Sequence, residues 1–191
     1  MSDLGRTTAF SDGVFAIAIT LLVLSIDVPG GLADRDVADF VGDEWPQFFA
    51  YFLSFAVIGR FWMSHHAQFA MLRTIDARLV VLNLVYLSFV CLIPFPTDLL
   101  GEYSESSVSV GLYALVIGIA SLLGVLMVRY TRGRGMLEDW AGMAAARMER
   151  GMRLPCVVFL GSIPFAFLIP QHTPLLWLLL LLDAVPGVRR R

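Results

Sequence analysis

The chain has 191 residues, of which 58% are hydrophobic and 16% are charged, and its mean hydropathy is +0.75. Too few polar side chains remain to coat a water-soluble globule of this length, so the composition excludes a soluble domain and favours a protein embedded in lipid. The 14 basic residues are all arginines and nearly balance 16 acids, so the net charge of −2 argues neither for nor against a nucleic-acid partner.

Six apolar segments are candidates for membrane-spanning helices, since a bilayer core of about 30 Å requires roughly 20 mostly apolar residues. In chain order they cover residues 7–26, 46–72, 79–97, 106–128, 154–169 and 175–188. The sixth is short because Asp183 and Pro186 interrupt it, and the prolines and polar residues of 170–174 predict a tight turn before it. We therefore expect an all-α integral membrane protein with six transmembrane helices in a single domain, residues 1–191.

Residues 136–152, between the fourth and fifth segments, place methionines, Leu137 and Trp140 at helical spacing among charged residues. The pattern fits an amphipathic helix at the cytoplasmic membrane surface and a packed loop helix equally well. Within the apolar segments, Gly111, Gly118 and Gly124 favour close helix packing. The only cysteines also lie in apolar runs; they show no disulfide or metal pattern and are expected to be small buried hydrophobes.

The arginines indicate how the chain crosses the membrane. With six spans, most of them fall on one side, and these are Arg6, Arg73, Arg78, Arg129, Arg132, Arg134, Arg147, Arg150, Arg153 and Arg189 to Arg191. By the positive-inside rule this side is cytoplasmic, so both termini are expected there. The opposite side is acidic, and the connection after the first segment would supply an outer vestibule that concentrates cations, formed by Asp27, Asp34, Asp36, Asp39 and Asp43.

Polar residues inside the first two segments are candidates for a functional site, because ionisable groups within a membrane are costly unless paired. Asp12, about one turn into the first segment, either belongs to such a site or caps the N–H groups of the helix start. In the second segment Trp62 and His65 share one helix face, while His66 points elsewhere. Two adjacent histidines diverge on a helix and no further ligand completes a tetrahedral set, so we expect no metal site.

A stripe at steps of three and four follows the first segment, and its members are Gly13, Ile17, Thr20, Leu21 and Leu24. Such a stripe is common where a membrane helix packs against its neighbours, and it also fits a pore lining. Asp27 continues the stripe and would place an acid at its outer mouth.

The run from Arg6 to Gly13 reads RxxxFSDG, and the second segment carries Trp62-x-x-His65-x-x-x-Phe69. Together these motifs closely resemble the transmembrane protein 175 family, the lysosomal potassium channel and its bacterial relatives. The resemblance covers the six-segment layout, with the specific motifs in the first two segments. One signature in six segments is similar to the single-repeat bacterial subunits, which assemble as homotetramers around a pore lined by the first helix.

By this resemblance, Ile17, Leu21 and Leu24 contribute apolar rings to the pore constriction, and Thr20 adds a ring of hydroxyls. The residues that match a structural polar network between the cytoplasmic ends of the first two helices are Arg6, Ser11, Asp12, Trp62 and His65. The TVGYG filter of ordinary potassium channels is absent, so selectivity would arise at a narrow, largely apolar constriction.

The expected function is passive conduction of potassium across the bacterial inner membrane by a homotetramer. Its partners would be the lipid bilayer and permeating monovalent cations, with potassium as the permeant ion, no cofactor and no nucleic acid. The alternative is a secondary transporter or a proton pathway that uses Asp12 and His65 as relay groups. We expect no enzyme, since the sequence pairs no nucleophile with a base and has no phosphate-binding loop or metal spacing.

Overall fold

The computed structural model describes residues 3–26, 40, 42 and 44–182, and within them the side chains of 179, 181 and 182 are left aside. The elements are α1 (Asp3–Leu21), the 3-10 turn η1 (Leu22–Ser25), α3 (Trp45–Ala70), α4 (Ala77–Leu92), α5 (Pro94–Glu102), α6 (Ser107–Gly133), α7 (Gly142–Leu168), the 3-10 turn η3 (Pro170–His172) and α8 (Thr173–Leu182). None of these described elements is a strand, which confirms the predicted all-α class.

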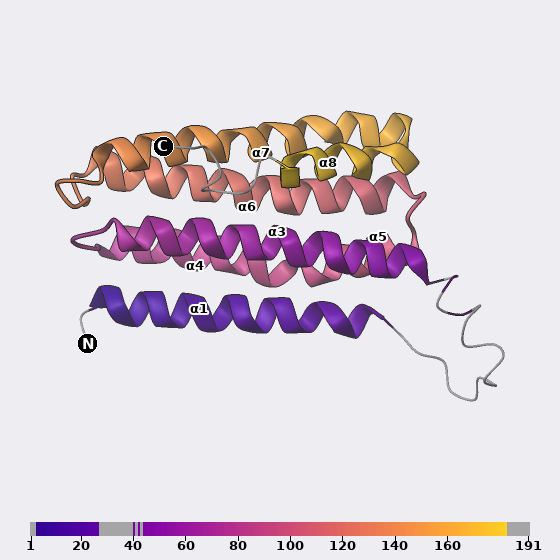
Figure 1. Cartoon of the computed structure of the whole chain (residues 1–191), viewed down its shortest axis with the longest axis horizontal. Coiled ribbons are helices and arrows are strands. Elements are labelled where there is room, and N and C mark those ends of the chain that lie inside the picture. The colour runs from indigo at the N-terminus through magenta and orange to yellow at the C-terminus, as the bar shows by residue number, and fades with distance from the viewer. Residues whose placement is uncertain (1–2, 27–39, 41, 43, 183–191) are drawn as a thin grey trace.

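The helices lie side by side along the long axis of the bundle (Figure 1). α1 lies at one edge, α3 and α4 follow it, and α6, α7 and α8 form the other side. Among the described residues, four helical segments are long and apolar enough to cross a membrane: α1 together with η1, α4 together with α5, α6 alone, and α7 alone. The 26-residue α3 is also long enough, although Arg60 and two histidines make it more polar, and α8 is described for 10 residues. These are the six predicted helices, with α4 and α5 counted as one.

The division of the chain into helices differs from the sequence expectation in two places. The predicted third span, 79–97, is divided at Pro94, whose missing N–H ends α4 and begins α5. The predicted surface helix 136–152 and the predicted fifth span 154–169 are not separate, because residues 142–168 form one continuous helix that contains Pro155 and Pro164. α7 packs along α6, which has the same length of 27 residues, and this packing holds the helix together across both prolines.

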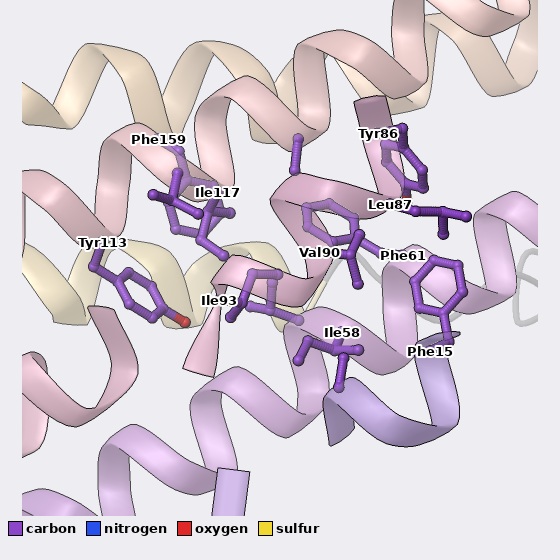
Figure 2. Packing of buried hydrophobic residues seen from close by; sticks show 14 of the residues in the cluster. Phe15, Ile58, Phe61, Tyr86, Leu87, Val90, Ile93, Tyr113, Ile117 and Phe159 are labelled. Carbon is purple, nitrogen blue, oxygen red and sulfur yellow. The ribbon is translucent and has the colours of Figure 1, made fainter. Parts of the chain in front are cut away.

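A core of aliphatic and aromatic side chains packs between the helices (Figure 2). Phe15 of α1, Phe61 of α3 and Tyr86 of α4 meet on one side, and Ile117 of α6 and Phe159 of α7 lie on the other. All five are buried. Because lipid is as apolar as these side chains, the core stabilises the bundle in a membrane through close packing rather than through removal from water.

Glycines bring α6 and α7 together, as the sequence predicted. A Cβ atom on Gly118 would lie 2.4 Å from Cδ2 of Leu160, and one on Gly124 would lie 2.6 Å from Cε of Met152. Both distances are far below van der Waals contact. At Gly118 the backbone nitrogen of Leu160 is also 3.3 Å from that position, so α6 and α7 approach closely there because no side chain is present, whereas at Gly124 the neighbouring atom is the flexible end of Met152.

We expect Gly118→Val to destabilise the protein by about 1–3 kcal/mol, because the new side chain overlaps Leu160 and forces α6 and α7 apart. Thermal unfolding in detergent measures the loss. Gly133→Val is the control, since a Cβ there meets nothing within 4 Å. Adding Leu160→Ala to Gly118→Val should restore part of the stability. Equal stability of Gly118→Val and the wild type would contradict close packing at this glycine.

The α3–α4 and α6–α7 connections lie at the end of the bundle where α1 starts (Figure 1), and backbone hydrogen bonds join them to each other. The backbone N–H of Arg73 donates to the carbonyl of Met136 at 2.9 Å, and the N–H of Glu138 donates to the carbonyl of Met71 at 2.9 Å. Nearby, Asp76 caps α4: the Tyr130 hydroxyl donates to Asp76 at 2.6 Å and the Leu79 N–H donates at 2.8 Å. These two bonds, the Tyr130 bond foremost, hold the pKa of Asp76 below its usual value.

The same end is rich in arginine, and one buried acid organises part of it. Glu149 of α7 is only 3% exposed, and its carboxylate accepts hydrogen bonds from Arg132 of α6 and Arg153 of α7. Nε of Arg129 lies 3.6 Å from the same carboxylate. A buried charge is tolerated only when paired, so this cluster fixes the α6–α7 pair at its end.

Candidate functional site

A chain of hydrogen bonds crosses from α3 to α4 to α1 inside the bundle. Nε2 of His65 lies 2.8 Å from Oδ1 of Asn83, and Nδ2 of Asn83 donates to the Ser11 hydroxyl at 3.0 Å. Ser11 in turn donates to the carbonyl of Thr7, one turn earlier in α1, at 2.9 Å. His65, Asn83 and Ser11 are at most 2% exposed, so the chain of bonds joins three helices away from lipid and water.

The direction of these hydrogen bonds determines which ring nitrogen of His65 carries the proton. Ser11 gives its only proton to Thr7, so it accepts from the Asn83 amide NH2 group, and the Asn83 oxygen is left as the acceptor for His65. His65 therefore carries its proton on Nε2. Its Nδ1 is buried and bonds to none of the described residues. This fits a neutral imidazole, in which that nitrogen carries no proton to donate.

Aromatic rings enclose the His65 ring. Phe69 stacks on it with ring centroids 4.1 Å apart, Tyr86 lies parallel at 5.8 Å, and Phe15 is tilted against it at 5.5 Å. These rings come from α3, α4 and α1, so the same three helices that share the hydrogen bonds also share this stack. The histidine is thereby fixed in one orientation.

The residues of the predicted polar network form two separate sets of hydrogen bonds: Ser11 and His65 belong to the buried chain, and Asp12 and Trp62 form a second link. Asp12 accepts a hydrogen bond from Nε1 of Trp62 at 2.9 Å, and this second link between α1 and α3 lies at a more exposed edge, where Trp62 is 40% exposed. Arg6 makes no hydrogen bond to either link among the residues that the structure describes. It lies farther toward the helix start, along a groove between α1 and α4 that Asp76 also lines.

Sequence reasoning missed Asn83, which connects the other members of the buried chain. A signal was present, since Asn83 is the most polar side chain in an otherwise apolar segment of residues 79–97, and polar groups there indicate a partner. Its partner could not be identified from sequence, because Ser11 lies 72 residues away.

One face of α1 is covered by no other described part of the chain. Its large apolar members are strongly exposed: Ile17 at 59%, Leu21 at 42% and Leu24 at 74%. The opposite face is buried against α3, α4 and α5, through Ser11, Phe15, Ala18 and Leu22. The predicted stripe is therefore the outward face of this helix within one subunit.

Thr20 on that face has a defined hydroxyl orientation. It donates to the carbonyl of Ile17 at 2.8 Å, so its oxygen lone pairs remain available as acceptors on the exposed side. After Leu21 the helix tightens into the 3-10 turn η1, in which residues three apart lie above each other. Leu24 consequently follows Leu21 along the same line.

Some predicted site residues cannot be placed. The outer vestibule acids Asp27, Asp34, Asp36, Asp39 and Asp43 lie outside the described residues. Within the described ranges, no group of three or more histidine, cysteine, aspartate or glutamate side chains is arranged to hold a metal ion.

Comparison with known proteins points to one family. A model of the endosomal/lysosomal potassium channel TMEM175 family matches residues 6–94. A potassium channel of Streptomyces collinus is 39% identical over 155 residues, which cover 78% of this chain and 75% of that protein. A potassium channel of Chamaesiphon minutus is 41% identical over 157 residues, which cover 78% of this chain and 74% of that protein.

The fold agrees with a solved relative. The crystal structure of a lysosomal potassium-selective channel TMEM175 homologue from Chamaesiphon minutus matches with a TM-score of 0.83 and 28% identity, covering 96% of both chains. The segment 6–94 contains both hydrogen-bonded links of the site and the exposed face of α1.

Proposed function

This chain belongs to the family of the endosomal/lysosomal potassium channel TMEM175, and from that premise we propose that it is a potassium-selective channel that conducts passively across the membrane. The relatives from Streptomyces collinus and Chamaesiphon minutus are named potassium channels, and the solved homologue is described as potassium-selective. We place the chain in the bacterial inner membrane as a multi-pass protein.

The observation that carries this proposal is the uncovered face of α1. Ile17, Leu21 and Leu24 are exposed, while the opposite face of the helix is fixed to the bundle. In a homotetramer, four copies of this face would surround a central axis and form apolar rings, with the Thr20 oxygens between them. No single subunit can enclose such a pore, so conduction would require assembly.

Selectivity would follow from the narrowness of the apolar rings. An ion that enters them loses hydration without gaining the carbonyl oxygens of an ordinary potassium filter, and loss of hydration costs sodium more than potassium. Thr20 would offset part of that loss by offering acceptor oxygens. The acids at 27–43 would concentrate cations at the outer mouth without distinguishing between them.

The polar links would have a structural role: they orient α1, which carries the pore face. His65 is enclosed by three rings, and its Nδ1 has no described partner to accept a proton from or pass one to. This geometry disfavours the alternative in which Asp12 and His65 relay protons.

The arginine-rich end would face the cytoplasm together with both termini, since cytoplasmic ends of membrane proteins are enriched in arginine. Such a channel needs no enzymatic activity and no cofactor.

The test is reconstitution of the purified protein in liposomes. We expect a reversal potential that follows the potassium gradient and moves little when a sodium gradient is imposed, with no dependence on a coupled ion. The mass of the detergent-solubilised oligomer should equal four subunits. A monomer, or a flux that requires a proton gradient, would reject the channel in favour of a transporter.

A further inference from the structure

A small void lies where α3, α6 and α7 meet, beside the point at which Pro155 interrupts the backbone hydrogen bonds of α7. Its volume is about 10 Å³, which is room for one water molecule and no more. Its lining residues come from all three helices and are Arg60, Phe61 and Ser64 of α3, Ser121 of α6, and Met152 and Pro155 of α7. Arg60 has an interaction of its own within the protein, so the polar groups that the void offers are the two serine hydroxyls.

The hydroxyl of Ser121 stands out from the other hydroxyls of the bundle. Hydroxyls in the described helices commonly donate to a carbonyl one turn earlier, as those of Thr131 and Ser162 do at 3.0 and 2.8 Å. Ser121 is only 3% exposed, and its hydroxyl has no hydrogen-bond partner among the described residues. A buried hydroxyl without a partner is costly, so a polar molecule in the void would relieve that cost.

Pro155 leaves an acceptor on the α7 side of the void. A proline has no N–H, so the carbonyl of Gly151, four residues earlier, loses its usual helical donor. In a helix a carbonyl oxygen lies beneath the nitrogen of the residue four positions later, so this oxygen lies on the Pro155 side of α7.

A wider groove between α3 and α7 gives water a way in. The groove encloses about 340 Å³, and it shares Arg60, Ser64 and Met152 with the void. It also contacts Gly151 and continues to Arg147, near the arginine-rich end of the bundle. Water from that side can therefore reach the void without crossing the apolar core.

We propose that the void binds one ordered water molecule that links α3, α6 and α7. The water accepts the proton of the Ser121 hydroxyl and donates its own two protons to the Ser64 oxygen and to the Gly151 carbonyl. Three partners are the usual number for a buried water. The link ties α3 to the α6–α7 pair at the proline, where α7 lacks a backbone hydrogen bond. This inference does not depend on the proposed potassium conduction.

A neighbouring crevice provides an internal comparison. It has a volume of about 20 Å³ and, apart from Arg60, its lining side chains are Val57, Phe61, Pro155, Phe159, Trp177 and Leu180. The indole N–H of Trp177 already donates to Ser162 at 3.0 Å. A water there would find too few polar partners, so we expect no ordered water in this crevice although it is the larger of the two.

The direct measurement is a structure of the wild-type protein in lipid nanodiscs, at a resolution that shows buried waters elsewhere in the bundle. We expect density for one water about 2.8 Å from Oγ of Ser121, and none in the apolar crevice. The density should be lost in Ser121→Ala. If the wild-type protein shows other buried waters but none beside Ser121, the proposal is wrong.

Thermal unfolding in detergent gives an independent test through the sign of the effect. Removing a hydroxyl that bonds a water loses one net hydrogen bond, which lowers the unfolding midpoint of a chain of this length by about 2–4 °C. Removing a buried hydroxyl that has no partner would leave the midpoint unchanged or raise it. We expect Ser121→Ala to show the loss. Ser88→Ala is the control, because the Ser88 hydroxyl donates only to the carbonyl of Val85 in its own helix.

A double variant distinguishes one shared water from two separate bonds. Ser121 is not hydrogen-bonded to Ser64, so a shared water is what would couple them. Ser64→Ala should also lower the midpoint, and the double variant should lose less than the sum of the two, because each change removes a partner of the same water. Additive losses, or a midpoint of Ser121→Ala at or above that of the wild type, would show that no water bridges the two serines.

Discussion

Replacing Ile17 by asparagine is expected to increase the current and to reduce the preference for potassium over sodium. Ile17 is 59% exposed on the uncovered face of α1, and in a tetramer its side chains would form the apolar ring nearest the cytoplasm. An amide at this ring would replace part of the lost hydration of either ion. If coordination by the amide oxygen lowers the barrier by about 1 kcal/mol, conduction rises about fivefold.

We expect a milder effect of the same substitution at Leu21 and Leu24, which lie farther along α1 from the proposed cytoplasmic ring. Val157→Ala is the control, because Val157 is 67% exposed on α7, away from the uncovered face of α1, and should tolerate the change with selectivity intact. Single-channel currents and reversal potentials under potassium and sodium gradients give both quantities. If Ile17→Asn assembles normally and leaves current and selectivity unchanged, α1 does not line the constriction.

The second large effect is expected from Asn83→Ala, which should destabilise the protein by about 2–4 kcal/mol and lower the yield of intact oligomer. The change removes the acceptor of the His65 N–H and the donor to Ser11, all of which are buried. Stranding a buried donor costs about 1–3 kcal/mol, and the cavity left by the side chain adds to this. Thermal unfolding and size-exclusion chromatography in detergent measure the two consequences.

Two further variants separate the hydrogen bonds from the packing. Ser88→Ala on the same helix is the control, because the Ser88 hydroxyl is exposed and donates only to the carbonyl of Val85. Asn83→Leu combined with His65→Phe replaces both partners with apolar groups of similar shape and should recover much of the stability. If Asn83→Ala is as stable as Ser88→Ala, the buried chain of hydrogen bonds contributes nothing to the fold.

The sequence alone was sufficient for the class of protein, the six helices and the family, because these depend on local properties. Apolar segments long enough to span a membrane can be recognised directly in the sequence, and the signature from Arg6 to Gly13 is contiguous. The pairing of Trp62 with Asp12 agrees with the two motifs that carried the resemblance. The role of the glycines on α6 could also be predicted, since small residues at helical spacing in membrane helices commonly allow close packing against a neighbouring helix.

The tertiary structure decided what depends on contacts between distant segments. It placed Asn83 between His65 and Ser11, and thereby determined the tautomer of the histidine. It joined 142–152 to the following span as α7, because packing against α6 outweighs the local amphipathic and proline signals. It also left one face of α1 uncovered and brought Arg60 and Arg147, 87 positions apart in the sequence, into one groove. Periodicity shows that a helix has faces, but only the packed neighbours determine which face each one covers.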